Sequence, residues 1–437
     1  MTKKKKQSEH ARTKIAHAQH RNEFMRRLER ICKLINPDAA LFNMFTPKEK
    51  EVIYTCRGAS AKIVAALGCK VPRTLLDEMS MAFNNILANK TIELIEGTGL
   101  QITMSDFWNV VISLESFVKD NYAGKEYYAD FLNDSNRLRR FMMKAMVIKD
   151  TMALHSTNLL KCLYDININL KPHTEDFAGY HRQLILTVTS FEPEKKLINI
   201  DGQNRTITRV AWTNNKEIRY LSIPAGKVDK NSGIPNIPVP VYIQQHAADR
   251  LWERISVPFK GLMYMELAMA VMEANVIRNS KDELLLTYSL SGKKVGYLLI
   301  DLINGILLIR TFLFLTNNGT PEGQKLEQLT GLTKLDKEYL DIDNMDGLVH
   351  SDILENEEVC SLFRKTGCGS LLEACNELKN SFMWELMPDR VTTSISRISN
   401  YLKAEETGNT ADNIGVVEDV ELEKDINTGS NAGGGES

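Results

Sequence analysis

The longest apolar run of the chain, Val295–Thr316, reads VGYLLIDLINGILLIRTFLFLT and can fold in only a few ways. Asp301 and Arg310 interrupt it, and the centre of a bilayer tolerates ionised side chains poorly, so we expect no membrane span here. The Asn304-Gly305 pair near its middle favours a β-hairpin, because a type I′ turn needs positive φ at both central residues. The run therefore predicts two paired strands of a buried sheet.

The segments before this hairpin predict a compact α+β module over residues 238–316. VPVYIQQ is typical of a short strand, HAADRLWERI of a helix, and FKGLMYMELAMAVMEANVI of a second, longer helix. DELLLTYSLS adds a strand directly before the hairpin. The expected order of elements is β-α-α-β-β-β.

The first helix of this module carries a stripe of basic side chains. Residues four apart stack along one side of a helix, so His246, Arg250 and Arg254 share a face. Such a face at the start of a helix suits a phosphate, and a histidine there could act as general acid or base in RNA cleavage without a metal. The alternative is a solvated helix surface, because Asp249 and Glu253 lie within pairing distance along the helix.

Arg310 is a further candidate for the same site. Simple strand alternation would give it the apolar neighbours Leu308, Phe312 and Phe314 on one face of the sheet. An arginine among apolar side chains needs a partner or a function. We therefore expect Arg310 to hold phosphate together with Arg250 and Arg254.

The pattern HAxxRxxER at His246–Arg254, followed by a second helix and three strands, resembles the RelE/ParE-like fold of small bacterial toxins, including BrnT-like relatives. The resemblance covers about residues 238–316, under a fifth of the chain. It implies a sheet with two helices on one face. In the toxins that cut RNA, basic and polar residues on the exposed sheet face perform the cleavage, so Tyr288 and Tyr297 become candidates beside His246 and Arg310.

The two ends of the chain carry opposite charge. Residues 1–33 hold eleven Lys and Arg against three Glu, and residues 404–437 hold nine Asp and Glu against one Lys. A basic arm is typical of proteins that bind polyphosphates, and an acidic tail of this composition is typical of disorder or of competition for the arm. Two solvated ends are the alternative. The RNA-binding candidates in the basic segment are Lys3, Lys4, Lys5, Lys6, Arg26 and Arg27.

The sequence pattern of the remaining residues changes once, near Pro172. Before it the periodicity is helical, and after it short β-branched and aromatic runs alternate with turn residues. The expected organisation is a basic arm (1–21), an α-helical domain (22–175), a small antiparallel β region (180–224), a Pro/Gly connector (225–240), the RelE-like module (238–316), a helical C-terminal part (320–403) and an acidic disordered tail (404–437).

These patterns predict a cytoplasmic α+β protein that binds RNA or acts as a metal-independent endoribonuclease. Seven scattered cysteines without a CxxC pair indicate reduced thiols, and we expect no metal, no small-molecule cofactor and no membrane partner. The alternative is a non-catalytic scaffold, of a phage or mobile element, that binds protein partners. A concave basic surface shared by His246 and Arg310 would favour RNA; salt bridges from Arg250 and Arg254 into the helical domain would favour the scaffold.

Overall fold

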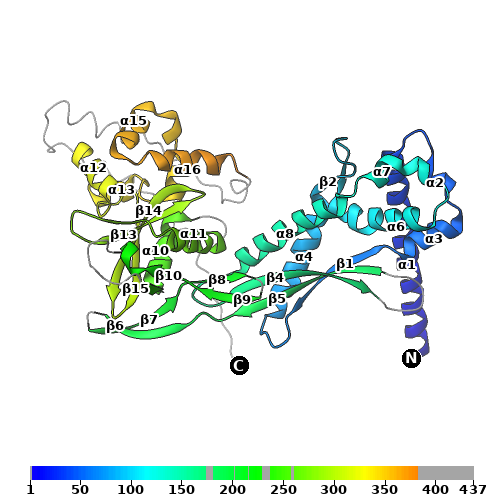
Figure 1. Ribbon diagram of the computed structural model, residues 1–437, viewed down its shortest axis with the longest axis horizontal. Coiled ribbons are helices and arrows are strands. Elements are labelled where there is room, and N and C mark those ends of the chain that lie inside the picture. Colours follow the sequence, from blue (N-terminus) through cyan, green and yellow to red (C-terminus); the bar gives the residue numbers. More distant parts are fainter. Residues whose placement is uncertain are drawn as a thin grey trace, which may run out of the picture.

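The protein is an elongated molecule of two lobes joined by long β-strands (Figure 1). The computed structural model describes residues 2–173, 181–200, 202–214, 216–228, 237–256 and 260–381. Helices and strands are mixed in both lobes, so the predicted α+β class is confirmed. The acidic tail, residues 404–437, and the end of the predicted helical part, residues 382–403, lie outside the described residues.

The N-terminal lobe is built mainly from helices around an aromatic core. Trp108 stacks on Phe141 at 5.8 Å between ring centroids, and Phe107 stacks on the same ring at 4.9 Å. Thr46 caps the start of the third helix, because Thr46 and Glu49 form a reciprocal capping box. The helices of this lobe are α1 (Thr2–Ile35), α2 (Leu41–Met44), α3 (Pro47–Thr55), α4 (Arg73–Asn89), α5 (Met104–Asp106), the π-helix η1 (Phe107–Val111), α6 (Ile112–Asn121), the 3-10 helix η2 (Lys125–Tyr128), α7 (Ala129–Asn133) and α8 (Arg137–Ser156).

The expectation of an all-helical segment over 22–175 is wrong at two long strands. β1 (Gly58–Ala65) is an edge strand of a three-stranded sheet, parallel to the central strand β5 (His181–Phe191), which is antiparallel to β4 (Leu163–His173). Gly58 allows β1 to cross directly beside η1, since a Cβ there would lie 2.4 Å from the carbonyl oxygen of Trp108. Local periodicity missed β1 because its partner lies far away in the sequence, and it missed β4, which pairs with the strand directly after it, because these residues were expected to continue the preceding helix. β2 (Thr91–Glu93) and β3 (Gln101–Thr103) form a separate short hairpin.

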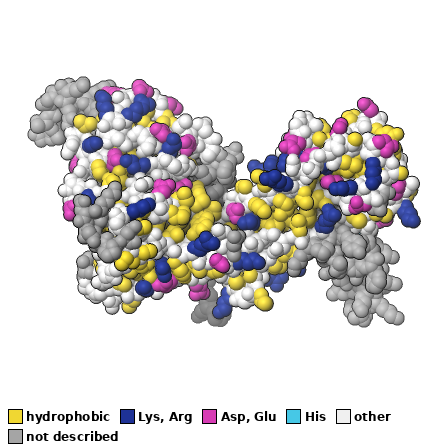
Figure 2. All heavy atoms as spheres, viewed as in Figure 1, with side chains coloured by type: hydrophobic (Ala, Val, Ile, Leu, Met, Phe, Trp, Pro, Cys, Tyr) yellow, Lys and Arg dark blue, Asp and Glu magenta, His cyan; other side chains and the backbone are white. Residues whose placement is uncertain are grey.

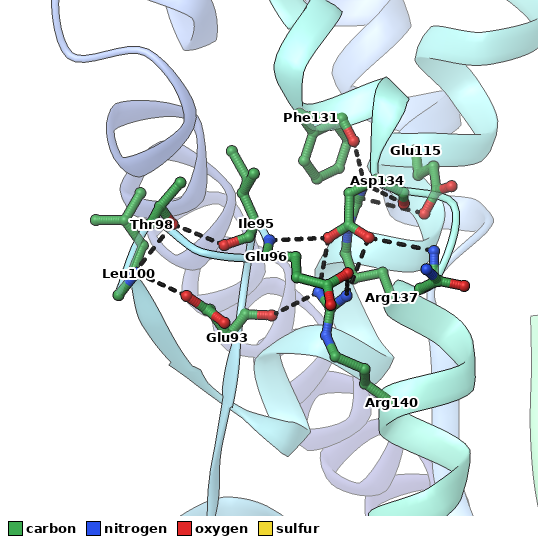
Figure 3. A network of polar contacts seen from close by, with 12 residues as sticks. Glu93, Ile95, Glu96, Thr98, Leu100, Glu115, Phe131, Asp134, Arg137 and Arg140 are labelled. Atoms are coloured by element: carbon green, nitrogen blue, oxygen red, sulfur yellow. Dashed lines mark hydrogen bonds and ion pairs between the residues drawn. The ribbon is translucent and has the colours of Figure 1, made fainter.

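A network of ion pairs fastens this hairpin to the start of α8 (Figure 3). Arg140 Nη2 donates to Asp134 Oδ2 at 2.6 Å, and the backbone N–H of Glu96 donates to the same oxygen at 3.1 Å. The hydrogen bond from Arg140 lowers the pKa of Asp134 to about 2. Arg137 is buried below them and donates to the carbonyl oxygens of Phe131 and Asp134.

The C-terminal lobe contains an eight-stranded sheet. Its strand order is β12-β13-β14-β15-β11-β7-β6, with β10 paired to β11, and all pairs are antiparallel except β11 with β15. The predicted turn between β14 and β15 is confirmed, since Asn304 has φ 48° and Gly305 has φ 75°. The strands are β6 (Lys195–Ile200), β7 (Gln203–Arg209), β10 (Ser222–Pro224), β11 (Pro238–Gln244), β12 (Val276–Arg278), β13 (Leu284–Leu290), β14 (Lys293–Ile303) and β15 (Ile306–Phe314), and β8 (Ala211–Asn214) and β9 (Glu217–Tyr220) form a hairpin of their own.

Helices pack around this sheet and define the surroundings of the predicted module. α10 (Gln245–Ile255) and α11 (Lys260–Glu273) follow β11 directly, and four strands rather than three come next, since the short β12 was not predicted. The sheet also continues through β7 and β6, so the module shares its sheet with strands of the predicted β region. The other helices of this lobe are α9 (Ala225–Val228), α12 (Pro321–Thr330), α13 (Lys334–Tyr339), α14 (Met345–Val349), the 3-10 helix η3 (Ile353–Glu355), α15 (Glu357–Thr366) and α16 (Gly369–Lys379).

The two lobes meet where α8 crosses α11. Gly261 lies against the backbone of Leu154, and a Cβ at Gly261 would come within 1.5 Å of the Leu154 carbonyl oxygen. A second contact links β8 to β4, because Thr213 Oγ1 donates to the carbonyl oxygen of Tyr164 at 3.2 Å. Across the described ranges no single helix is long and apolar enough to cross a bilayer, although α10 and α11, which form a bent pair, reach that length together.

Candidate nucleic-acid interface

The basic stripe predicted on α10 is largely neutralised by carboxylates. Arg254 forms an ion pair with Asp343, just before α14, and burial is the main cause that lowers the pKa of this guanidinium. Arg250 pairs with Glu253 on its own helix at 2.9 Å. His246 is exposed in the first turn of α10 and has no hydrogen bond or ion pair within the described part of the chain. Arg254 therefore holds α10 to the C-terminal helices, and not to the N-terminal helical domain named in our prediction.

Arg310 does not have the neighbours that strand alternation predicts. The pairing of β14 with β15 shifts by one residue at Arg310, which forms a β-bulge. The extra residue reverses the alternation, so Phe312 points to the face covered by α11, where it packs on the buried Tyr288 at 5.4 Å between ring centroids. Arg310 Nη1 lies 2.9 Å from Asp301 Oδ2 on β14. The expected apolar surroundings, Leu308, Phe312 and Phe314 on one face, are thus wrong, and Arg310 has a carboxylate partner.

The prediction that Tyr288 and Tyr297 lie on an exposed sheet face is wrong. Tyr288 is completely buried, and its hydroxyl donates to the carbonyl oxygen of Met263 in α11 at 3.2 Å. Tyr297 is also buried, and its hydroxyl donates to Glu322 Oε1 on α12 at 3.0 Å. Helices cover both faces of this part of the sheet, which the sequence of the strands alone does not reveal. Neither ring can stack on a base without unfolding of the sheet.

The basic segment at the N-terminus is part of one continuous helix. α1 runs from Thr2 to Ile35, and its N-terminal half projects beyond the body of the lobe (Figure 1). Helical spacing gives this helix one apolar face. Its buried members are Phe24, Leu28, Ile31 and Cys32, and Ile35 is half-buried. The side chains of Lys3, Lys4, Lys5 and Lys6 lie outside the described residues.

Two arginines of α1 converge on one buried carboxylate. Arg27 and Arg30 both form ion pairs with Asp106, whose side chain is only 2% exposed. Arg27 Nη2 also donates to Ser105 Oγ at 3.1 Å. Arg26 lies on the outer side of the helix, 79% exposed, and its nearest acidic partner is Glu23 at 3.5 Å. One carboxylate thus serves two arginines, and this face of α1 keeps a net positive charge.

A small cavity opens beside these arginines. It has a volume of about 60 Å³ and is lined by His20, Glu23, Phe24, Arg27, Arg57 and Asn109. Arg57 stacks on the ring of Tyr54 at 3.9 Å and donates from Nη1 to the Tyr54 carbonyl oxygen at 2.8 Å. His20 Nδ1 lies 3.2 Å from the Tyr54 hydroxyl oxygen. Burial, and then the positive groups Arg57, His17 and Arg27, lower the pKa of His20.

The sequence signal for this cavity was weak. Arg30 shares the helical spacing of Arg26 and Arg27, but Arg57 falls in a segment predicted as helix and is the last residue before β1. Asp106 is 79 residues from Arg27, and only the fold brings them together. Thr103 caps the start of α5, since its hydroxyl oxygen accepts from the backbone N–H of Asp106 at 3.0 Å. This cap does not indicate which side chains pair with the Asp106 carboxylate.

Comparison with known proteins adds no relative. No protein-family model matches the chain, and neither the curated proteins nor the solved structures give a match. The RelE/ParE-like resemblance of residues 238–316 therefore stays a prediction. Over the described ranges, no group of three or more His, Cys, Asp and Glu side chains could hold a metal ion.

Proposed function

We propose that the protein binds RNA through the basic residues of α1. The observation that supports this most is the form of α1, a single 34-residue helix with a projecting N-terminal half. Six Lys and Arg lie among the first fourteen residues, where Glu9 is the acidic residue. Lysine and arginine contacts to phosphates provide affinity that does not depend on base sequence. A straight basic helix offers such contacts along a phosphate backbone.

Binding is better supported than cleavage. A nuclease needs groups that stabilise developing charge on a phosphate, and the arginines expected to do so at the module already have carboxylate partners. Of the residues proposed for RNA there, His246 is the one that remains exposed without such a partner among the described residues. The endoribonuclease hypothesis thus rests on one histidine, whereas the binding hypothesis rests on a whole helix.

The salt dependence of RNA affinity tests the proposal. In the variant Lys3→Gln, Lys4→Gln, Lys5→Gln, Lys6→Gln, four positive charges are lost from α1. Affinity for a short single-stranded RNA is measured by fluorescence anisotropy between roughly 50 and 200 mM salt. The slope of log affinity against log salt should decrease in magnitude by about 3, since each phosphate contact contributes about 0.7 for a single strand.

A control variant with the same charge change separates local from overall electrostatics. Lys281, Lys325, Lys334 and Lys365 are exposed lysines of the C-terminal lobe, and their replacement by Gln should leave the slope as in the wild type. Equal slopes for both variants would show that α1 is not the binding surface. A wild-type protein without salt-dependent RNA binding would remove the proposal altogether.

The second candidate function is a non-catalytic interaction or scaffold protein. The Arg254–Asp343 pair favours it, because this pair uses a predicted phosphate ligand to hold the fold together. Figure 2 adds a patch of exposed apolar side chains between the lobes, over α8 and α11. Its most exposed members are Val147, Met143 and Met272. Absence of RNA binding at low salt, with the protein folded, would leave this candidate as the better one.

A further inference from the structure

The cavity beside α1 has the chemistry of a site for a single oxyanion. We infer that it binds one phosphate group, held between the guanidinium groups of Arg27 and Arg57 with His20 and Asn109 at its wall. This deepens the proposed function and rests on it where the phosphate belongs to RNA. Free inorganic phosphate is the other source of the same chemistry, and the experiment below distinguishes the two.

The size and lining of the cavity fit this ligand. A volume of about 60 Å³ is enough for a few water molecules or one small oxyanion, given that the centre of one water molecule needs roughly 10 to 15 Å³. The two guanidinium groups are forked donors that match the oxygens of a phosphate. The amide of Asn109 and the imidazole of His20 can donate as well.

The two arginines are held in place before any ligand arrives. Arg27 uses Nε for Asp106 and Nη2 for Ser105, and its Nη1 has no hydrogen-bond partner among the residues the structure describes. Arg57 is fixed by its stacking on Tyr54 and by the hydrogen bond to the Tyr54 carbonyl oxygen. A site whose donors are already ordered loses less entropy on binding.

The cavity is lined by two arginines, Arg27 and Arg57, and by one acid, Glu23. Arg27 shares the carboxylate of Asp106 with Arg30. Glu23 lines the cavity but lies 3.5 Å from Arg26, and it is 58% exposed to solvent that screens it. An anion in the cavity would interact favourably with the guanidinium groups of Arg27 and Arg57.

His20 reports on the occupancy of this cavity. Its imidazole contacts the Tyr54 hydroxyl, and burial, followed by the positive groups Arg57, His17 and Arg27, disfavours a positive charge on it. An anion placed among them would favour the charged imidazole and raise its pKa. The occupied and empty states therefore differ in a quantity that NMR measures for one residue.

The experiment is an NMR titration of the histidine rings of the full chain, with inorganic phosphate and with potassium chloride at equal ionic strength. Phosphate should raise the pKa of His20 by about one unit, while the ring signals of the exposed His246 should not respond to phosphate. The shift should be lost in Arg57→Gln, and in Asn109→Leu, which fills the cavity and removes no charge. Arg73→Gln, at a 94% exposed arginine of the same lobe, should keep it.

Each result decides between defined alternatives. An unchanged His20 in phosphate, or an equal shift in chloride, would overturn the inference and indicate a water-filled cavity. If a short RNA produces the same shift, the bound phosphate is that of RNA. If free phosphate produces the shift while RNA shows no salt-dependent binding, the phosphate site stands and the proposed RNA function falls.

Discussion

Two helices of this protein carry arginines at similar spacing, and their tertiary surroundings give them different roles. On α10, Arg250 and Arg254 each have a carboxylate of their own, Glu253 and Asp343. On α1, Arg27 and Arg30 share the single buried carboxylate of Asp106. In the first arrangement each positive charge is neutralised by a carboxylate, and in the second, one carboxylate serves two arginines beside a cavity. The number of carboxylates per arginine, rather than the arginine stripe itself, separates a structural clamp from a candidate binding surface.

The largest expected effect comes from breaking the clamp on α10. Arg254→Ala leaves Asp343, 13% exposed, without its ion-pair partner, and should lower the free energy of unfolding by about 3 kcal/mol. Chemical denaturation measures this change. RNA affinity should stay as in the wild type, since the proposed surface is on the other lobe. Arg250→Ala is the matched control and should cost only a few tenths of a kcal/mol, because its pair is exposed.

If Arg254→Ala proves as mild as Arg250→Ala, the pair with Asp343 is not a clamp. If it instead weakens RNA binding without loss of stability, α10 belongs to the binding surface. In either case the contrast between the two helices would disappear.

The parts of the fold that could be predicted depend on neighbours in the sequence. The hairpin at Asn304-Gly305 is specified by a few adjacent residues and is confirmed, and the capped start of α3 is set in the same way by Thr46 and Glu49. β1 was missed because its partner strand, β5, lies outside any local window, whereas β4 pairs with the next strand and was missed because its residues were expected to continue a helix. Arg310 was misplaced because a bulge adds one residue to the strand, and no single residue type signals it.

The candidate site shows the same limit. The basic face of α1 follows from helical spacing, and so does its apolar face. Asp106 reaches Arg27 across 79 residues of sequence, and the cavity brings Arg57 and Asn109 beside α1 from separate segments. A stripe of charged residues can be identified from the sequence of one helix, whereas the carboxylate that pairs with it here, Asp106, lies far away in the sequence and is identified only from the structure.

A smaller effect is expected at acid pH, where each lobe loses one paired carboxylate. Hydrogen bonds from Arg140 lower the pKa of Asp134 to about 2, and those from Tyr242 and Arg209 lower the pKa of Glu194 to about 2. Because both folded-state values lie below the unfolded ones, the stabilisation is complete above about pH 4.5 and is lost as the pH falls toward 2. Each group should contribute about 1 kcal/mol after screening by solvent.

Thermal unfolding of Asp134→Asn and Glu194→Gln between pH 5 and roughly 2.5 measures these contributions. Each variant should be less stable than the wild type at pH 5, and the difference should shrink toward the acid end. The loss should be greater for Asp134, whose side chain is 5% exposed, than for Glu194, whose side chain is 31% exposed. A difference that does not change with pH would mean that neither carboxylate titrates as the ion pairs require.

The smallest effect is expected at His246, the residue on which the ribonuclease hypothesis now depends. It is exposed and unpaired among the described residues, so His246→Ala should change neither stability nor RNA affinity. The decisive measurement is the integrity of total RNA incubated with wild type, with this variant and with the control His155→Ala, another exposed histidine. We expect intact RNA in all three. RNA that is cut by the wild type and the control but not by His246→Ala would show that α10 carries chemistry despite its neutralised arginines, and the contrast with α1 would then separate a catalytic surface from a binding one.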